Sequence, residues 1–167
     1  KIQIEFMKNN PDFVLCGTWC FIVNEYDKII GKKKGYSNYE DIKTKIISIN
    51  YFTHSSIFFI KSEILSMGGY NEEMIRAQDY DLLLKIIPKH KVAIIPQLLS
   101  YYRINNRSIS FSNNKNQEKF AIKARLNALK KYGYPKIYYL KLIRPLVFYY
   151  LVPVWFKKIL MKLLWKT

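Results

Sequence analysis

The chain has 167 residues, of which 50% are hydrophobic, and it carries a formal net charge of +16. This length allows one domain-sized core, and so high a hydrophobic content excludes general disorder. The charge is uneven, because residues 1–81 contain 10 basic and 11 acidic side chains, whereas residues 82–167 contain 18 basic side chains and a single acidic one, Glu118. The C-terminal half is therefore expected to meet an anionic partner, and a phospholipid surface, a nucleotide diphosphate and nucleic acid all fit this charge.

The first predicted elements are a helix, two strands and a turn. Residues 1–8 have the pattern of a helix that has already begun, so we expect a fragment whose N-terminal half is missing. Residues 13–24 are rich in β-branched and aromatic side chains and predict a buried strand, which a turn and a shorter strand follow. The Gly- and Lys-rich residues 31–35 are interpreted as a solvated turn without a functional role.

The middle of the chain predicts short elements of both kinds. Residues 39–49 indicate a helix, and the apolar residues 56–60 suit a short central strand. Ser62 is expected to cap a helix of one or two turns that ends at Gly68.

A further helix and a pair of strands complete this pattern. The helix is predicted over residues 79–87, and it stops at Pro88. Residues 91–95 and 98–104 predict two brief strands that Pro96 separates. Because helices and strands interleave, the sequence favours an α/β sheet over an all-helical or all-β domain.

One carboxylate is placed where chemistry could use it. The Gly68-Gly69 pair lets the backbone turn, and the polar run after it delivers Asp79 to the start of the helix at residues 79–87. The N–H groups and the dipole of a first helical turn favour an ionised carboxylate, which can serve as a general base. A plain helix cap is the alternative for Asp79. Because residues two apart on a helix do not share a face, Asp81 is not expected to act beside Asp79, and one of the two is expected to cap or to face solvent.

Three motifs follow each other in this part of the chain. They are the turn Gly68-Gly69-Tyr70-Asn71-Glu72, the helix start Gln78-Asp79-Tyr80-Asp81-Leu82, and the pair Tyr102-Arg103 leading to Ser108-Ile109-Ser110. In this order and at these spacings they resemble the second half of the catalytic domain of family 2 glycosyltransferases, the inverting GT-A enzymes. The resemblance implies a partial GT-A, Rossmann-like mixed sheet with flanking helices over residues 1–112, without its nucleotide-binding half, and leaves residues 113–167 as a helical extension.

The resemblance also implies roles for single residues. Asp79 corresponds to the catalytic base, and Gln78 stands beside it where Glu is common. Arg103 is expected to help neutralise the leaving diphosphate, or alternatively to be a structural partner of a carboxylate at the sheet edge. His54 precedes the strand expected at residues 56–60 and would face the donor or the acceptor, unless it is structural or solvated.

A divalent cation, Mg²⁺ or Mn²⁺, is the cofactor that the resemblance implies. Asp79-Tyr80-Asp81 is an Asp-x-Asp, but it follows a polar run rather than a hydrophobic strand, so we do not interpret it as the metal motif of these enzymes. The cation ligands are expected in the missing N-terminal half, and no metal ligand is predicted in this chain. The fragment alone is expected to be inactive.

The predicted function is transfer of a sugar from a nucleotide-sugar donor to an acceptor hydroxyl with inversion. The acceptor is expected to be a glycan or a lipid-linked molecule, and the pathway to be the synthesis of a cell-surface polysaccharide or glycoconjugate. These expectations rest on the resemblance and not on composition or spacing.

The C-terminal extension predicts basic amphipathic helices from residue 117 onward. Its longest uncharged stretch, residues 145–156, has twelve residues, whereas a transmembrane helix needs about twenty. Near the end, one helix face carries Lys158, Lys162 and Lys166, with Trp155 and Trp165 near them. The opposite arc is apolar and contains Phe156, Ile159, Leu160, Leu163 and Leu164. This pattern is typical of a helix that lies on an anionic membrane surface, so we expect a peripheral protein on the cytoplasmic face of a membrane; packing of the apolar face on the missing half is the alternative.

Two non-catalytic interpretations are also open. Residues 115–131 and the tyrosines after them could form a basic module that binds single-stranded nucleic acid by charge and stacking. The apolar C-terminus argues against that module, so no nucleic-acid partner is predicted, and a basic membrane-binding module remains. A third interpretation keeps the fold and makes the protein a scaffold subunit of a glycan assembly complex.

Overall fold

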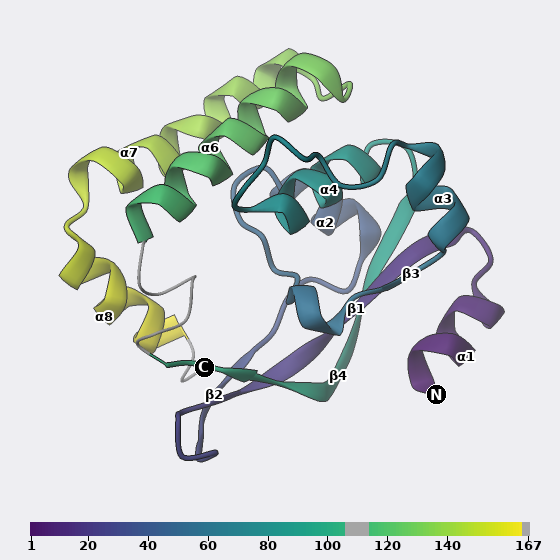
Figure 1. The fold of residues 1–167 in the computed structure, drawn as a ribbon, viewed down its shortest axis with the longest axis horizontal. Coiled ribbons are helices and arrows are strands. Elements are labelled where there is room, and N and C mark those ends of the chain that lie inside the picture. Colours follow the sequence, from purple (N-terminus) through teal and green to yellow (C-terminus); the bar gives the residue numbers. More distant parts are fainter. Residues whose placement is uncertain (106–113, 165–167) are drawn as a thin grey trace.

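The computed structural model describes residues 1–105 and 114–164, and a mixed sheet lies at its centre (Figure 1). The middle strand, β1 (Phe13–Val23), pairs in parallel with β4 (Lys91–Arg103) along one edge. Its other edge pairs antiparallel with β2 (Ile29–Lys33) near one end and with β3 (Phe58–Phe59) near the other. The predicted α/β fold with a mixed sheet and flanking helices is confirmed.

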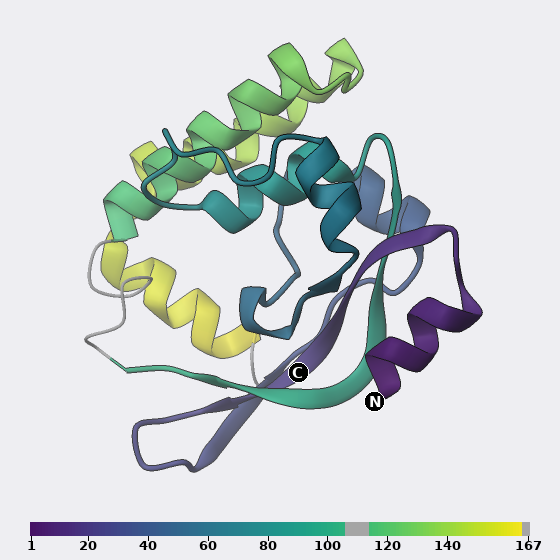
Figure 2. The same cartoon turned by 45° about the vertical axis from the view of Figure 1, so that its right-hand side comes forward.

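The two faces of the β1–β4 pair are covered by different helices. Side chains alternate between the faces of a strand, so neighbouring residues of β1 enter different clusters. Cys16 packs in a small cluster with Phe6 of α1 (Ile2–Asn9), whereas Leu15 belongs to the main core with residues of α2 (Tyr39–Lys45) and α4 (Gln78–Ile86). Figure 2 shows α1 on one side of the strands and the other helices on the opposite side.

β4 is one strand, so the prediction of two strands at residues 91–95 and 98–104 is wrong. Ile95 lies opposite Thr18 and Leu98 lies opposite Trp19, which leaves Pro96 and one further residue as a bulge in β4. Proline lacks the N–H that a regular ladder needs, but a bulge tolerates it without ending the strand.

A strand is present within the predicted residues 56–60, but the prediction of its length and of its central position in the sheet is wrong. β3 contains two residues and pairs with β1 as an edge strand, and Ser56 belongs to a short 3₁₀ helix, η1 (His54–Ser56). The Ser56 hydroxyl donates to the carbonyl of Thr53 at 2.8 Å and accepts from the amide of Thr18 at 3.3 Å. Such local bonds compete with a sheet ladder and favour a turn.

The helices around the motifs are close to the predicted ones. α2 (Tyr39–Lys45) is capped by Asn38, and α4 (Gln78–Ile86) ends before Pro88 as predicted. α3 (Lys61–Ser66) ends shortly before Gly68, but Ser62 lies inside this helix, and the residue before it, Ile60, makes no side-chain capping bond. The prediction that Ser62 caps α3 is therefore wrong.

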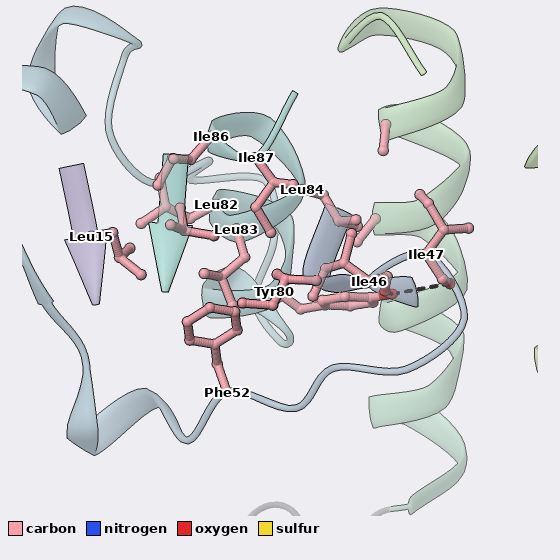
Figure 3. Packing of buried hydrophobic residues seen from close by; sticks show 14 of the residues in the cluster. Leu15, Ile46, Ile47, Phe52, Tyr80, Leu82, Leu83, Leu84, Ile86 and Ile87 are labelled. Carbon is pink, nitrogen blue, oxygen red and sulfur yellow. Dashed lines mark hydrogen bonds between the residues drawn. The ribbon is translucent and has the colours of Figure 1, made fainter. Parts of the chain in front are cut away.

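α4 is buried on nearly every side because it lies between the sheet and the C-terminal helices. Its residues Tyr80, Leu83, Leu84 and Ile86 each expose 4% or less of their surface. Figure 3 shows this packing and the Tyr80 hydroxyl, which donates to the carbonyls of Ile46 and Ile47. Each fully buried aliphatic side chain of this kind contributes about 1.5–3 kcal/mol to folding, so α4 is held firmly.

The C-terminal helices form an outer layer on α4. They are α6 (Asn114–Lys131), the 3₁₀ helix η2 (Lys136–Leu142), α7 (Ile143–Leu151) and α8 (Val154–Leu164). α6 begins at Asn114, slightly before residue 117, where the sequence predicts the first amphipathic helix, and its Ala124 and Ala128 enter the main core. The motif residues Ser108, Ile109 and Ser110 and the boundary predicted after residue 112 lie outside the described residues.

Part of the C-terminal positive charge is used inside the protein. The Nε of Arg125 donates to the carbonyl of Ile47 at 2.6 Å, and Lys141 donates to the carbonyl of Thr44. Lys157, whose side chain is 2% exposed, pairs with Glu118 at 2.6 Å. Among the described residues, no helix combines the length and the hydropathy that a membrane crossing requires.

Candidate functional site

The start of α4 is set by a loop with unusual backbone angles. Gly68 and Gly69 have φ values of +82° and +58°, which glycine adopts without steric cost. Ala77, at the N-cap position, has a φ of +56°, a conformation that costs an L-residue about 1–2 kcal/mol. Ala77 is 3% exposed and sits in the main core, so packing holds this strained turn and fixes where the helix begins.

Asp79 lies in the first turn of α4 and is half-buried. Because Ala77 occupies the N-cap position, the interpretation of Asp79 as the cap itself is not supported. Its charge acts on two neighbours from other elements. Burial and then the charge of Asp79 raise the pKa of Tyr70, and the same charge favours the protonated form of Lys33. Both side chains are therefore within the electrostatic range of Asp79, which lies at a helix end whose dipole stabilises a carboxylate.

A pocket of about 530 Å³ lies next to this helix start, and it brings together two predicted site residues, His54 and Gln78. Tyr70 also lines this pocket, and its hydroxyl lies 3.0 Å from the Nε2 of His54. The remaining lining comes from the loop before α4, namely Asn71, Glu72, Met74 and Ile75. An imidazole, a phenol and an amide at one opening offer both donors and acceptors to a hydroxyl-rich ligand.

Lys33 is a site residue that sequence reasoning missed. Residues 31–33 belong to β2, so the prediction of a solvated turn is wrong for Lys33, whose ammonium donates to the carbonyl of Phe52 at 2.8 Å. Burial lowers the pKa of Lys33, while the charge of Asp79 acts in the opposite direction. The sequence signal that could have identified Lys33 is the alternation of side chains along a strand. In β2, Lys33 and the exposed Lys32 lie on opposite faces. Tyr70 was also missed, although it is the aromatic residue of the Gly-Gly turn.

Asp81 is fully buried, so the expectation that one carboxylate caps or faces solvent is wrong for this residue. The hydroxyl of Tyr132, the residue directly after α6, donates to the Oδ2 of Asp81 at 3.3 Å. The Oδ1 of Asp81 has no hydrogen-bond partner among the described residues. Burial raises the pKa of Asp81, and the charge of Lys85 with the nearby Tyr132 and asparagine side chains partly offsets this. Burial and the neighbouring Asp81 raise the pKa of Tyr132 to about 12, which keeps its hydroxyl a donor.

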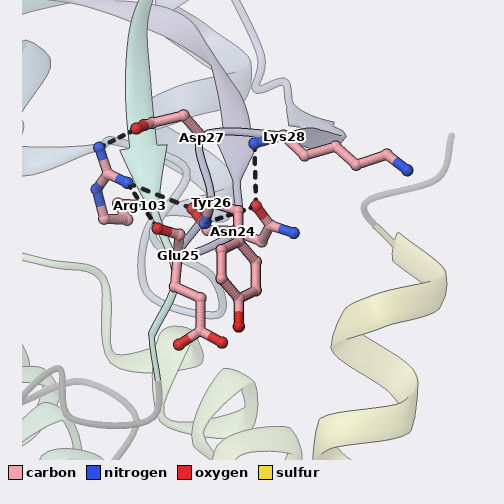
Figure 4. A network of polar contacts seen from close by, with 6 residues as sticks. All are labelled: Asn24, Glu25, Tyr26, Asp27, Lys28 and Arg103. Carbon is pink, nitrogen blue, oxygen red and sulfur yellow. Dashed lines mark hydrogen bonds and ion pairs between the residues drawn. The ribbon is translucent and has the colours of Figure 1, made fainter.

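Arg103 is held at the far end of β4, in a network with the turn between β1 and β2 (Figure 4). Its Nη2 pairs with Asp27, and its Nη1 lies 3.5 Å from the carbonyls of Asn24 and Glu25. Asn24 shapes the turn by accepting from the amides of Tyr26 and Lys28 at 3.0 Å. Of the two interpretations of Arg103, this geometry corresponds to the structural one.

A metal site needs several His, Cys, Asp or Glu side chains close together. In residues 1–105 and 114–164, no group of three or more His, Cys, Asp and Glu side chains could hold a metal ion. The divalent cation that the resemblance implies, with ligands in the N-terminal half, stays a prediction.

Several glycosyltransferases are similar to this chain in sequence. An uncharacterised glycosyltransferase of Methanocaldococcus jannaschii is 32% identical over 121 residues, which cover 71% of this chain and 41% of the relative. The amylovoran biosynthesis glycosyltransferase of Erwinia amylovora is 30% identical over 109 residues, 65% of this chain and 40% of the relative. The O-antigen biosynthesis glycosyltransferase WbnJ of Escherichia coli is 33% identical over 113 residues, 64% of this chain and 42% of the relative.

The chain thus spans about two fifths of the length of these curated relatives. No protein-family model matches it. The similarities extend over about two thirds of the chain, and together with the α/β fold they support a glycosyltransferase domain in it.

Proposed function

We propose that this chain carries the general base of an inverting glycosyltransferase of the GT-A type, family 2, and that the base is Asp79. The observation that carries the proposal is the place of Asp79 in the first turn of α4. It lies near Lys33 and Tyr70, beside the pocket of His54, Tyr70 and Gln78. The dipole of a helix start favours a carboxylate, and a side chain that is only half-buried can be reached by an acceptor hydroxyl, as a general base must be.

The reaction is a single displacement. The carboxylate of Asp79 takes the proton of an acceptor hydroxyl while the hydroxyl oxygen forms a bond to the anomeric carbon of the donor sugar. The bond between that carbon and the diphosphate oxygen breaks, and its electron pair leaves with the nucleotide diphosphate. Because the attack comes from the face opposite the leaving group, the configuration of the anomeric carbon inverts. Gln78, Tyr70 and His54 would hold sugar hydroxyls during this step.

The divalent cation and Arg103 have no assigned role in this reaction. A divalent cation would neutralise the leaving diphosphate in the enzymes that the chain resembles, but the described residues contain no ligand set for it. Arg103 is engaged by Asp27 at the turn between β1 and β2, which favours an anchoring role over direct contact with the diphosphate.

The substrate class follows from the relatives. Glycosyltransferases use a nucleotide-sugar donor and a glycan or lipid-linked acceptor, and two of the relatives are named for the biosynthesis of amylovoran and of O-antigen. We therefore propose that the whole protein works in the synthesis of a cell-surface polysaccharide or glycoconjugate.

We also propose that the C-terminal helices hold the protein on the cytoplasmic face of an anionic membrane. α8 exposes Trp155, Phe156, Ile159 and Leu163, while Lys157 points back to Glu118 on α6. Residues 82–167 carry 18 basic side chains and one acidic side chain, which complements an anionic leaflet. The other side chains of the predicted pattern, Lys158, Lys162, Leu164, Trp165 and Lys166, lie outside the side chains that the structure describes.

Vesicle flotation of the full-length protein tests the membrane proposal. We expect it to float with vesicles that contain phosphatidylglycerol and not with pure phosphatidylcholine vesicles, and W155A/F156A to weaken flotation. Equal flotation of the variant and the original protein would show that Trp155 and Phe156 do not contribute to membrane binding, and it would contradict the proposed role of α8.

The catalytic proposal is tested with Asp79→Asn in the full-length protein. General-base catalysis contributes about 10²–10⁴-fold, so we expect kcat for sugar transfer to fall about 10³-fold while donor binding is retained. Asp41→Asn is the matched control, because Asp41 is an exposed acid in the first turn of α2. Equal activity of the two variants would exclude Asp79 as the base.

A further inference from the structure

A second pocket lies between α6, α7 and the segment after α2, and it shares no lining residue with the His54 pocket. Its volume is about 260 Å³. Ligand sites for whole small molecules usually have about 300–1,000 Å³. The pocket is therefore suited to one chemical group and a few further atoms rather than to a nucleotide sugar.

The pocket is positively charged. Arg125 is 9% exposed and is fixed by the carbonyls of Ile47 and Ser48. Arg144 is exposed and, within the described part of the chain, has no hydrogen bond or ion pair; its charge acts on the phenol of Tyr51. The one carboxylate of the lining, Glu118, is 2.6 Å from the ammonium of Lys157, which compensates its charge. Two guanidinium groups thus remain to attract an anion.

The rest of the lining is largely apolar, and its apolar members are Ile49, Ala121, Ile122, Pro145 and Phe148. An apolar stripe begins at the rim of the pocket on α7, where Ile143, Val147, Tyr150 and Leu151 are all exposed. Successive residues of a helix are about 100° apart, so Arg144 and Phe148 border this stripe. The apolar surface therefore continues from the pocket to the outside of the protein.

We propose that this pocket binds a phosphate group that is carried by an apolar chain. Arg144 and the fixed Arg125 receive the phosphate, and the chain leaves along Phe148 and the stripe on α7. Guanidinium groups suit phosphate because they donate several hydrogen bonds from one plane. Neither the role of Asp79 nor the attachment of α8 to a membrane is needed for this site.

The probes for this proposal are octyl phosphate, inorganic phosphate and octyl glucoside, each titrated into the full-length protein by calorimetry below its micelle concentration. We expect octyl phosphate to bind at least about tenfold more tightly than either of the others, because it alone combines the charge with the chain. Equal binding of inorganic phosphate would overturn the proposed apolar chain, and equal binding of octyl glucoside would overturn the phosphate.

Two variants locate the site. Arg144→Gln removes an exposed cation without a folding role, and we expect it to weaken octyl phosphate binding about tenfold, as the loss of a charged hydrogen bond does. Lys130→Gln removes the same charge from an exposed position of α6 outside the pocket and should change binding less than about twofold. Equal losses in the two variants would show general charge attraction and refute the site.

Ala121→Leu fills the pocket without changing its charge. We expect it to abolish octyl phosphate binding while the melting temperature stays near that of the original protein, because Ala121 is only partly buried. Unchanged binding in a folded Ala121→Leu protein would also refute the site.

Discussion

The two pockets of this protein are built from opposite charges. The pocket at the start of α4 lies beside the carboxylate of Asp79, and its polar lining includes the acid Glu72 together with His54, Tyr70 and Gln78. The pocket between α6 and α7 has two arginines set against apolar walls. A carboxylate among hydroxyl-binding groups can remove a proton, whereas guanidinium groups among apolar side chains can only hold an anion. The difference separates a place for chemistry from a place for attachment.

The two pockets are nevertheless parts of one framework. Tyr80 follows Asp79 in α4, and its ring lies 4.8 Å from the guanidinium carbon of Arg125, which lines the second pocket. The same ring carries the hydroxyl that bonds to Ile46 and Ile47. The pockets therefore share a rigid wall while their ligand-binding groups remain different.

The largest expected effect separates the pockets by function. Asp79→Asn should lower sugar transfer about 10³-fold, yet its octyl phosphate affinity should stay within about twofold of the original, because no lining residue is shared. Transfer assays and calorimetry on the same preparation measure both quantities. A parallel loss of transfer and octyl phosphate binding would contradict two independent sites.

Lys33→Met tests whether the cation near Asp79 matters for the first pocket. We expect kcat/KM to fall about tenfold, because the carboxylate loses a neighbouring positive charge in a partly buried site. Lys32→Met is the matched control, since Lys32 is exposed and lies on the other face of β2. If both variants keep full activity, Lys33 has only a structural role through the carbonyl of Phe52.

Asp81→Asn tests the buried carboxylate behind the first pocket. Burial raises the pKa of Asp81 above its ordinary value of 3.8, so the native state holds this proton more tightly than the unfolded state. Stability from this group is therefore present at low pH and is lost as the pH rises from about 4 through the native pKa. Urea unfolding should show the variant gaining stability relative to the original protein over that range. A difference that does not change with pH would contradict a raised pKa.

The smallest effect is expected at the turn between β1 and β2. Arg103 and Asp27 are both exposed, with side-chain exposures of 48% and 74%. Exposed ion pairs contribute about 0.2–1 kcal/mol, so Arg103→Gln and Asp27→Asn should each lower the unfolding free energy by less than about 1 kcal/mol. Their transfer rates should be alike. If sugar transfer by Arg103→Gln is much slower than by Asp27→Asn, Arg103 contacts the leaving diphosphate and its role is not only structural.

The parts of the fold that could be predicted from the sequence have strong local patterns. β1 is a long run of β-branched and aromatic residues, and α4 combines a Gly pair before it with Pro88 after it. β4 was divided in two because Pro96 normally interrupts a strand, and only the pairing partner shows that a bulge absorbs it. Local patterns therefore identified the elements, but pairing across the sheet decided their extent.

The site was predictable in part for a similar reason. The motifs and the predicted elements identify the positions of Asp79, Gln78 and His54. Lys33, in contrast, lies in a lysine-rich run that predicts a solvated turn, and only the pairing of β2 with β1 shows that its side chain points into the protein. The rule that residues two apart do not share a helix face holds for Asp79 and Asp81. The further expectation of solvent exposure is wrong because α4 is covered on both sides. The face of α4 that carries Asp81 packs against the C-terminal helices rather than against water.

The contact of α6 with α4 also limits how this protein can be divided. Ala124, Ala128 and Leu129 of α6 are buried in the same core as Leu83 and Leu84, and Tyr132 supplies the hydrogen bond of Asp81. A protein shortened to residues 1–112 would expose the back of the helix that carries Asp79 and leave a buried carboxylate without its donor. We therefore expect α6 to unfold together with the sheet in one cooperative transition, and proteolysis should not release it as an intact piece.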